Sequence, residues 1–168
     1  VNKMFGITQT FIFKPTKWWD VNASADVYYS DTNSKIPVTL QYLSGWSGEF
    51  NISNDFILNS NKTLLANLNY NYTTEGVDNL DYNSSANQLD IALKWLLLDK
   101  SLIISLYAND ILSSNRFTYT SFSNGIENSF RNYYDERFFR IGVIYNFGKK
   151  FNINNRENKN QDEYNRTN

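Results

Sequence analysis

The last regular stretch of the chain, residues 137–148, alternates apolar and polar side chains at a period of two. Its apolar residues occupy every second position, at Phe139, Ile141, Val143, Tyr145 and Phe147. In an extended chain these five side chains share one face. Arg140, Gly142 and Asn146 point the other way, and Ile144 is the one apolar exception among them. The stretch is therefore predicted to be a β-strand with one apolar face and one polar face.

The same alternation recurs throughout the chain. It is present in the segments 4–14, 18–29, 46–58, 62–73, 87–97 and 102–112. Each segment is about eleven residues long, the length that a tilted strand needs to cross a membrane. The connections alternate between short turns, near 15–17, 59–61 and 98–101, and longer polar loops, at 30–45, 74–86 and 113–135. Within the last of these we expect two strand extensions around a loop near 123–125.

Short turns at one rim and long loops at the other are typical of a transmembrane β-barrel, with the short rim in the periplasm. Aromatic residues gather near both rims, as the interfacial girdles of such a barrel do. Near the short turns they are Phe11, Phe13, Trp18, Trp19, Phe56, Trp95, Tyr145 and Phe147, and near the long loops Tyr28, Tyr29, Trp46, Tyr70 and Tyr72. The predicted fold is all-β, an antiparallel transmembrane β-barrel segment of about seven or eight meander strands. A soluble carbohydrate-binding β-sandwich shares the alternation but does not require the rim asymmetry.

The number of strands decides whether the segment closes by itself. Seven crossings result if region 113–135 lies outside the membrane, whereas a closed single-chain barrel has an even number. Residues 1–148 are therefore predicted to be the C-terminal part of a larger barrel, followed by a polar, disordered periplasmic tail at 149–168. If residues 117–131 contain one more crossing, eight strands would form a small self-closed barrel with an adhesive or structural role.

Composition excludes several kinds of chemistry. The chain contains neither histidine nor cysteine, which removes imidazole- and thiolate-based catalysis and the commonest metal ligands. We therefore predict no catalytic, cofactor-binding or metal-binding residue, and no enzymatic activity. The net charge of -1, without a basic stripe, gives no reason to expect nucleic acid.

The polar face supplies the candidate binding residues instead. The predicted lumen-facing set is Asp20, Asn22, Asp26, Asn67, Asn69, Asn71, Asp90 and Lys94, opposite the lipid-facing Phe139, Ile141, Val143, Tyr145 and Phe147. Asp20 and Asp26 lie roughly 20 Å apart along their strand, too far for an acid–base pair. They are expected to be solvated charges, and a pairing across strands stays open. The three asparagines are expected either to hydrogen-bond a sugar or peptide or simply to line the lumen. Asp110 is expected to make a strand-end hydrogen bond.

Several segments resemble one known family in order and spacing. They are Asn109-Asp110-Ile111, the lead-in Tyr133 to Arg137, Tyr145-Asn146-Phe147-Gly148-Lys149-Lys150, the tail Asp162-Glu163-Tyr164-Asn165-Arg166, and upstream Lys14-Pro15-Thr16-Lys17-Trp18-Trp19. Together they resemble the C-terminal barrel of TonB-dependent outer-membrane receptors, specifically the Bacteroidetes-type outer membrane protein β-barrel family. The tail here is less basic than is usual for that family.

The resemblance implies a large barrel in the cell outer membrane with an N-terminal plug domain and a TonB box, neither of which occurs in this sequence. Such receptors import scarce nutrients, such as metal chelates, glycans or peptides, with energy relayed by TonB. The implied partners are the outer-membrane lipid bilayer, the TonB system through the absent plug, the barrel-assembly machinery and a surface lipoprotein. The substrate is expected to be recognised by the plug and the outer loops.

Overall fold

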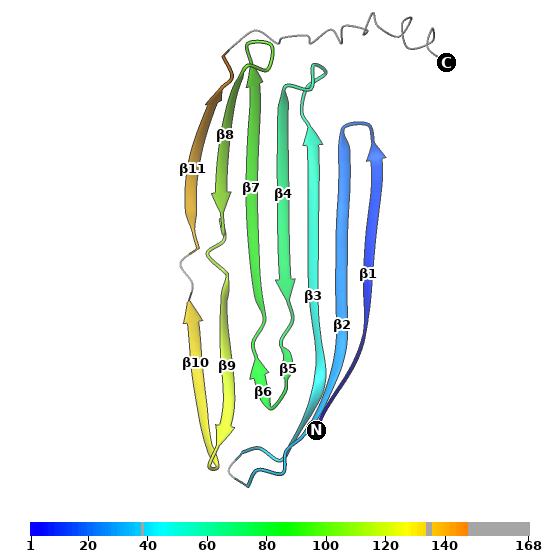
Figure 1. Ribbon diagram of the computed structural model, residues 1–168, viewed down its shortest axis with the longest axis vertical. Helices are drawn as coiled ribbons and strands as arrows, with labels where there is room; N and C mark the ends of the chain where they lie inside the picture. Colours follow the sequence, from blue (N-terminus) through cyan, green and yellow to red (C-terminus); the bar gives the residue numbers. More distant parts are fainter. Residues whose placement is uncertain (38, 134–135, 148–168) are drawn as a thin grey trace, which may run out of the picture.

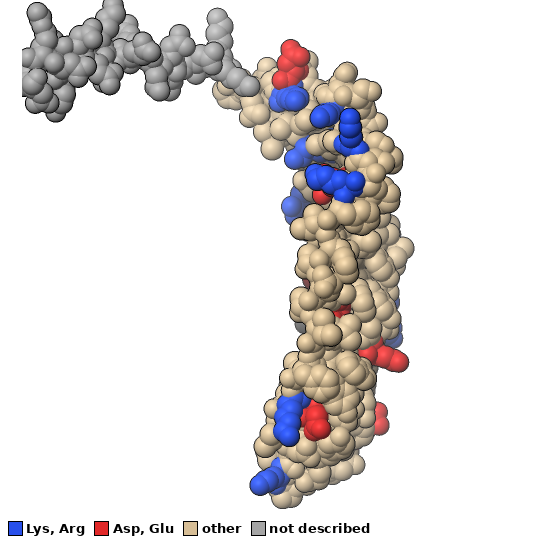
Figure 2. All heavy atoms as spheres, turned by 90° about the vertical axis from the view of Figure 1, so that its right-hand side faces the viewer, with Lys and Arg blue, Asp and Glu red and all other residues tan. Residues whose placement is uncertain are grey.

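The computed structural model describes residues 1–37, 39–133 and 136–147, and it is a single curved layer of antiparallel strands (Figure 1; edge-on in Figure 2). Seven strands form the main sheet in the order β1-β2-β3-β4-β7-β8-β11, and four form a second sheet in the order β10-β9-β6-β5. Their bounds are β1 Asn2–Thr16, β2 Trp19–Asn33, β3 Tyr42–Ile57, β4 Leu64–Thr73, β5 Gly76–Asp78, β6 Asp81–Asn83, β7 Ala86–Leu97, β8 Leu102–Asn109, β9 Arg116–Ser123, β10 Ile126–Tyr133 and β11 Phe138–Tyr145.

The second sheet continues the main sheet at one end. The β5–β6 hairpin joins β4 to β7, and the β9–β10 hairpin joins β8 to β11 (Figure 1). The chain therefore runs the height of the layer seven times, which confirms the predicted meander of antiparallel strands. The region 117–131 forms a hairpin beyond β8 and β11 and adds no eighth strand to the main sheet.

The two ends of the layer differ in their connections. At one end, here called the short-turn end, the turns lie at 17–18, 59–62 and 98–101. At the opposite, long-loop end lie the β2–β3 connection and the two hairpins (Figure 1). The short turns at 59–61 and 98–101 are confirmed. The predicted turn at 15–17 is placed too early, because β1 continues to Thr16 through an irregular register after Phe13. Pro15 lies at this irregularity, and a bulge is a position at which a sheet accepts proline.

About half of each of two predicted long loops is regular strand. Residues 30–45 form a loop only between the end of β2 at Asn33 and the start of β3 at Tyr42. Residues 74–86 hold the β5–β6 hairpin, which Ser47 of β3 anchors: its hydroxyl accepts from the Val77 amide at 2.9 Å and donates to the Val77 carbonyl at 3.1 Å. Gly76 is required beside this contact, since a Cβ there would collide with the Ser47 side chain. The expected extensions around 123–125 are confirmed as β9 and β10.

The last two strands of the main sheet, β8 and β11, are shorter than the pattern indicated. The strand expected at 102–112 ends at Asn109, and the final strand expected at 137–148 spans Phe138 to Tyr145. The boundary at 148 and the predicted tail at 149–168 lie outside the described residues.

Candidate functional site: two faces and a long-loop end

The antiparallel register sorts the side chains into an apolar face and a polar face. Across the middle of the main sheet, Ala66 of β4 pairs with Leu93, Leu93 with Leu106, and Leu106 with Ile141. One position along each strand, Asn67 pairs with Ala92, Ala92 with Tyr107, and Tyr107 with Arg140. Cross-strand partners point to the same side of a sheet, so the first row belongs to the apolar face and the second to the polar face.

The apolar face has nothing packed on it among the described residues. Ile7 and Ile141 are 75% and 74% exposed, and only Val21, Leu43 and Val77 are buried apolar residues in this part of the chain. A water-soluble sandwich would bury this face against a second sheet. An exposed apolar surface of this extent marks an interface with a membrane or a partner.

Aromatic clusters border the apolar face at both ends. Near the long-loop end, Tyr29 lies between Phe5 and Trp46, with both ring centroids 5.3 Å away. Near the short-turn end, Trp19 stacks on Trp18 at 6.2 Å and on Phe56 at 6.0 Å. The predicted girdle at the long-loop end gains Phe5. It loses Tyr28, which pairs with Gly6 and Ser47 on the polar face.

The spacing of the two clusters matches a bilayer. Trp46 and Phe56 are ten residues apart on β3. That interval is roughly 33 Å along a strand at about 3.3 Å per residue. At the tilt of about 40° typical of barrel strands, it corresponds to an apolar band roughly 25 Å high, the height found in outer-membrane barrels.

The polar face holds every predicted lumen residue. The register places all eight on it: Asp20, Asn22, Asp26, Asn67, Asn69, Asn71, Asp90 and Lys94. That this face lines a lumen stays a prediction. The predicted lipid-facing residues of β11 (Phe139, Ile141, Val143 and Tyr145) lie on the opposite face, with Phe147 two residues beyond the strand.

Amide side chains form a hydrogen-bonded ladder on the polar face. The Asn67 amide donates to Asp55 Oδ1 at 3.0 Å and to Ser53 Oγ at 3.1 Å, and the Asn51 amide donates to the side-chain oxygens of Asn69, at 3.3 Å, and Asn71. Because sequence spacing gives no cross-strand register, Ser53 and Asp55 were missed as neighbours of the asparagine stripe. The ladder presents fixed donors and acceptors to a polar solute or water.

Carboxylates also face one another across strands. Asp20 pairs in register with Asp55, and Asp26 with Glu49. Like charges directly opposite one another are destabilising. Asp20 is compensated by Lys14, whose Nζ lies 2.9 Å from its Oδ1, and Asp26 accepts a hydrogen bond from Thr8. These pairs lie on an open, exposed surface, as expected of a wet face.

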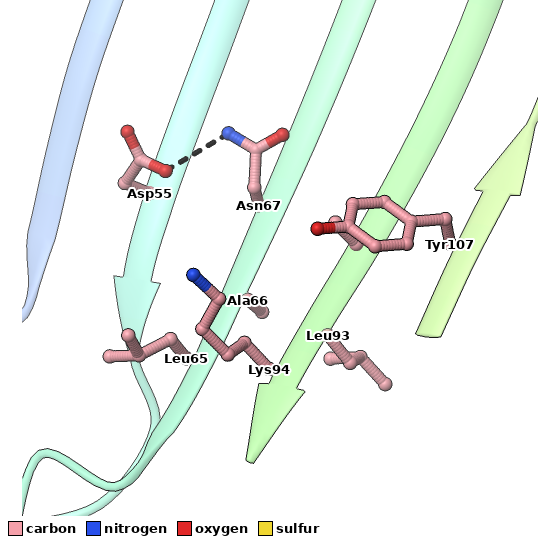
Figure 3. A pocket seen from close by; sticks show the side chains of 8 residues that line it. Asp55, Leu65, Ala66, Asn67, Leu93, Lys94 and Tyr107 are labelled. Atoms are coloured by element: carbon pink, nitrogen blue, oxygen red, sulfur yellow. Dashed lines mark hydrogen bonds between the residues drawn. The ribbon is translucent and has the colours of Figure 1, made fainter. Parts of the chain in front are cut away.

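A shallow hollow of about 290 Å³ lies on the polar face toward the short-turn end. Asp55, Asn67, Lys94 and Tyr107 lie around it, and the hydrogen bond between Asn67 and Asp55 forms one side (Figure 3). It brings two residues of the predicted lumen-facing set, Asn67 and Lys94, together with Asp55 and Tyr107, which lie outside that set. Among the described residues no group of three or more acidic side chains is placed to hold a metal ion.

Asp110 makes the expected strand-end hydrogen bonds. It is 1% exposed and has a positive φ of 44° directly after β8. Its amide donates to Asp90 Oδ1 at 2.9 Å, and its own Oδ1 accepts from the Ser114 amide at 3.0 Å. Asp90 and Asp110 therefore stabilise the break between β8 and β9.

An open cavity of about 770 Å³ lies at the long-loop end. It lies among the start of β1, the β2–β3 connection, the β5–β6 turn and β9. An isolated bridge between Thr39 and Ser123 joins that connection to β9, and Asn2 donates to Asn79 Oδ1 at 2.8 Å. The lining combines apolar side chains, chiefly Ile36, Leu80 and Phe122, with amides and hydroxyls.

One hydrogen bond at this end changes the pKa of a tyrosine. The Tyr119 hydroxyl donates to Asp81 Oδ2 at 2.5 Å, joining β9 to β6. This hydrogen bond, followed by burial and the negative charges of Asp81 and Asp78, raises the pKa of Tyr119 from 10.0 to about 12.

No helix among the described residues is long and apolar enough to cross a membrane. Searches of curated proteins and of solved structures returned no match to this chain. A family model, the outer membrane protein beta-barrel family, matches residues 2–145. That match spans all seven strands of the main sheet, including both aromatic clusters. The chain therefore belongs to the outer membrane protein beta-barrel family, and its sheet is a segment of barrel in the lipid bilayer of the cell outer membrane.

Proposed function

We propose that this sheet is part of the barrel wall of a Bacteroidetes-type TonB-dependent receptor that imports a scarce nutrient, such as a metal chelate, a glycan or a peptide. The observation that supports this most is the pair of open edges. β1 and β11 each have one neighbour in the described main sheet, and an unpaired strand edge within a bilayer is too costly to persist. We therefore infer that further strands pair with β1 and β11. The complete barrel then encloses a wider lumen than seven strands could form.

The polar face and the long-loop end fit this role. A wide lumen lined with amides and carboxylates, such as Asn69, Asn71 and Asp90, allows polar solutes to pass. The cavity at the long-loop end provides a surface for recognition where outer-membrane barrels carry their extracellular loops. The proposal makes the protein a transporter rather than an enzyme. Its further partners are TonB acting through a plug domain, the barrel-assembly machinery and a surface lipoprotein.

Energised uptake is the test that separates an importer from a passive pore. Cells carrying the protein, and cells with its gene deleted, are supplied with labelled metal chelates, oligosaccharides and peptides, with and without a protonophore. We expect one ligand class to accumulate only in cells that carry the protein, and its accumulation to collapse when the protonophore removes the proton gradient. Uptake that depends on the protein but is unchanged by the protonophore would contradict the TonB-dependent mechanism. Failure of all three ligand classes to accumulate would contradict nutrient import itself.

A further inference from the structure

A groove of about 540 Å³ lies at the short-turn end, between two adjacent turns. One turn contributes Lys17 and Trp18, from the β1–β2 connection. The other contributes the end of β3 and the β3–β4 turn, with Leu58 and Lys62 among its residues. The groove is distinct from the polar-face hollow and from the cavity at the long-loop end.

Hydrogen bonds fix the shape of this groove. The Ile57 amide donates to the Trp18 carbonyl at 2.8 Å, which joins the two turns directly. Asn59 Oδ1 accepts from the amides of Thr63, at 2.8 Å, and Leu64, at 3.0 Å, so the second turn is closed by its own side chain. The groove is therefore a structured feature of the rim.

Two positive charges in the groove have no carboxylate partner within the described part of the chain. Lys14 is ion-paired with Asp20, whereas neither Lys17 nor Lys62 has a carboxylate within ion-pair distance among the described residues, so their ammonium groups are available. An ammonium group at a membrane surface attracts anionic lipid headgroups. Two of them beside one groove favour a single phosphate-bearing occupant.

The groove is also continuous with the lipid-facing surface. Trp18 is 51% exposed and stacks on Trp19 and on Phe56 of the apolar face. Leu58, 50% exposed, provides a second apolar wall. Tryptophan at the end of an apolar band sits at headgroup level. Because outer-membrane barrels place their short turns in the periplasm, the groove lies at the headgroups of the inner leaflet.

From this arrangement we propose that the groove between the β1–β2 and β3–β4 turns binds an anionic phospholipid of the inner leaflet. Its phosphate lies between the ammonium groups of Lys17 and Lys62, and its glycerol and upper acyl chains lie against Trp18 and Leu58. The inference concerns the membrane anchoring of the barrel and does not depend on what the barrel transports.

Site-specific quenching tests the proposal. The chain has no cysteine, so Ser60→Cys in the full protein, with any other cysteine replaced, places one bimane label at the groove. The labelled protein is reconstituted in phosphatidylethanolamine bilayers that contain brominated phosphatidylglycerol or, separately, brominated phosphatidylcholine. We expect the relative association constant for phosphatidylglycerol to exceed that for phosphatidylcholine by about fivefold if one lysine attracts the headgroup and by about thirtyfold if both do.

Two variants decide whether the lysines cause the preference. Lys17→Gln/Lys62→Gln is expected to remove it, whereas Lys3→Gln/Lys100→Gln, which makes the same change in charge outside the groove, is expected to keep it. Equal constants for the two lipids in the unaltered protein would overturn the proposal, as would a preference that survives the first double substitution or disappears with the second. Relief of quenching by millimolar inorganic phosphate would also overturn it, because the groove would then take a free anion rather than a lipid.

Discussion

At the scale of single residues, Ile141 and Ile144 show how strictly position determines environment. They lie three positions apart on β11 with the same side chain, yet Ile141 pairs with Leu106 on the apolar face and Ile144 with Ile103 on the polar face. Both are exposed, by 74% and 55%. In the bilayer one borders hydrocarbon, and by our assignment the other borders the water-filled interior.

Arginine substitutions at these two positions test the assignment of the faces. Ile141→Arg is expected to lower the free energy of unfolding by about 2–4 kcal/mol, because a charge would enter the hydrocarbon near its midplane. Ile144→Arg is the matched control and should cost less than about 1 kcal/mol, in the range of an ordinary surface change. The measurement is urea unfolding of the full protein in liposomes. Equal losses at the two positions would show that the faces are wrongly assigned.

Asp110 offers a second test at this scale. Asp110→Ala is expected to cost about 1–3 kcal/mol, since the partly buried Ser114 amide would lose its acceptor and alanine is strained at a positive φ. Asp110→Asn keeps an acceptor and tolerates this backbone conformation, so it should be much milder. Urea unfolding of both variants measures the difference. A loss with asparagine as large as that with alanine would mean that the negative charge, not the hydrogen bond, stabilises the break after β8.

At the scale of elements, the sequence pattern identified the strands of the main sheet and the β9–β10 hairpin, but it missed the β5–β6 hairpin. The alternation at residues 87–97 predicted β7 because hydrocarbon on one side and water on the other impose a period of two. The strands of the β5–β6 hairpin are only three residues long. They are too short for a period of two to be recognised, so residues 74–86 were expected to be a loop. The cross-strand neighbours Asp20 and Asp55 were equally invisible, because register depends on turn geometry that residue spacing does not encode.

The pairing of β6 with β9 should weaken at alkaline pH, when Tyr119 loses its hydroxyl proton. The pKa of Tyr119 in the folded protein, about 12, lies above its ordinary value of 10.0. The stabilising contribution of its neutral hydroxyl is therefore complete below pH 10 and lost as the pH rises from 10 to 12. The stability difference between the unaltered protein and Tyr119→Phe should shrink over that interval in urea unfolding. Tyr82→Phe on β6 is the control. A difference that stays constant from pH 8 to 12 would argue against the hydrogen bond to Asp81 as the cause.

At the scale of the whole molecule, the central claim is that this sheet is one wall of a larger outer-membrane barrel. Seven strands with two open edges, one lipid-facing surface and three buried apolar residues in the described part of the chain make a stable fold only when the edges are paired and the apolar face is covered. The family match implies that the lipid bilayer covers the apolar face. From the two open edges we predict that additional strands complete the barrel.

The most direct test is the size of the native protein in the outer membrane. An antibody to the β9–β10 hairpin is used to blot outer-membrane fractions, unheated and boiled in detergent. We predict a heat-modifiable band whose mass after boiling is several times the 19.6 kDa of these 168 residues. A band near 19.6 kDa both before and after boiling would show that the segment exists without additional strands, and it would contradict the claim of a larger barrel.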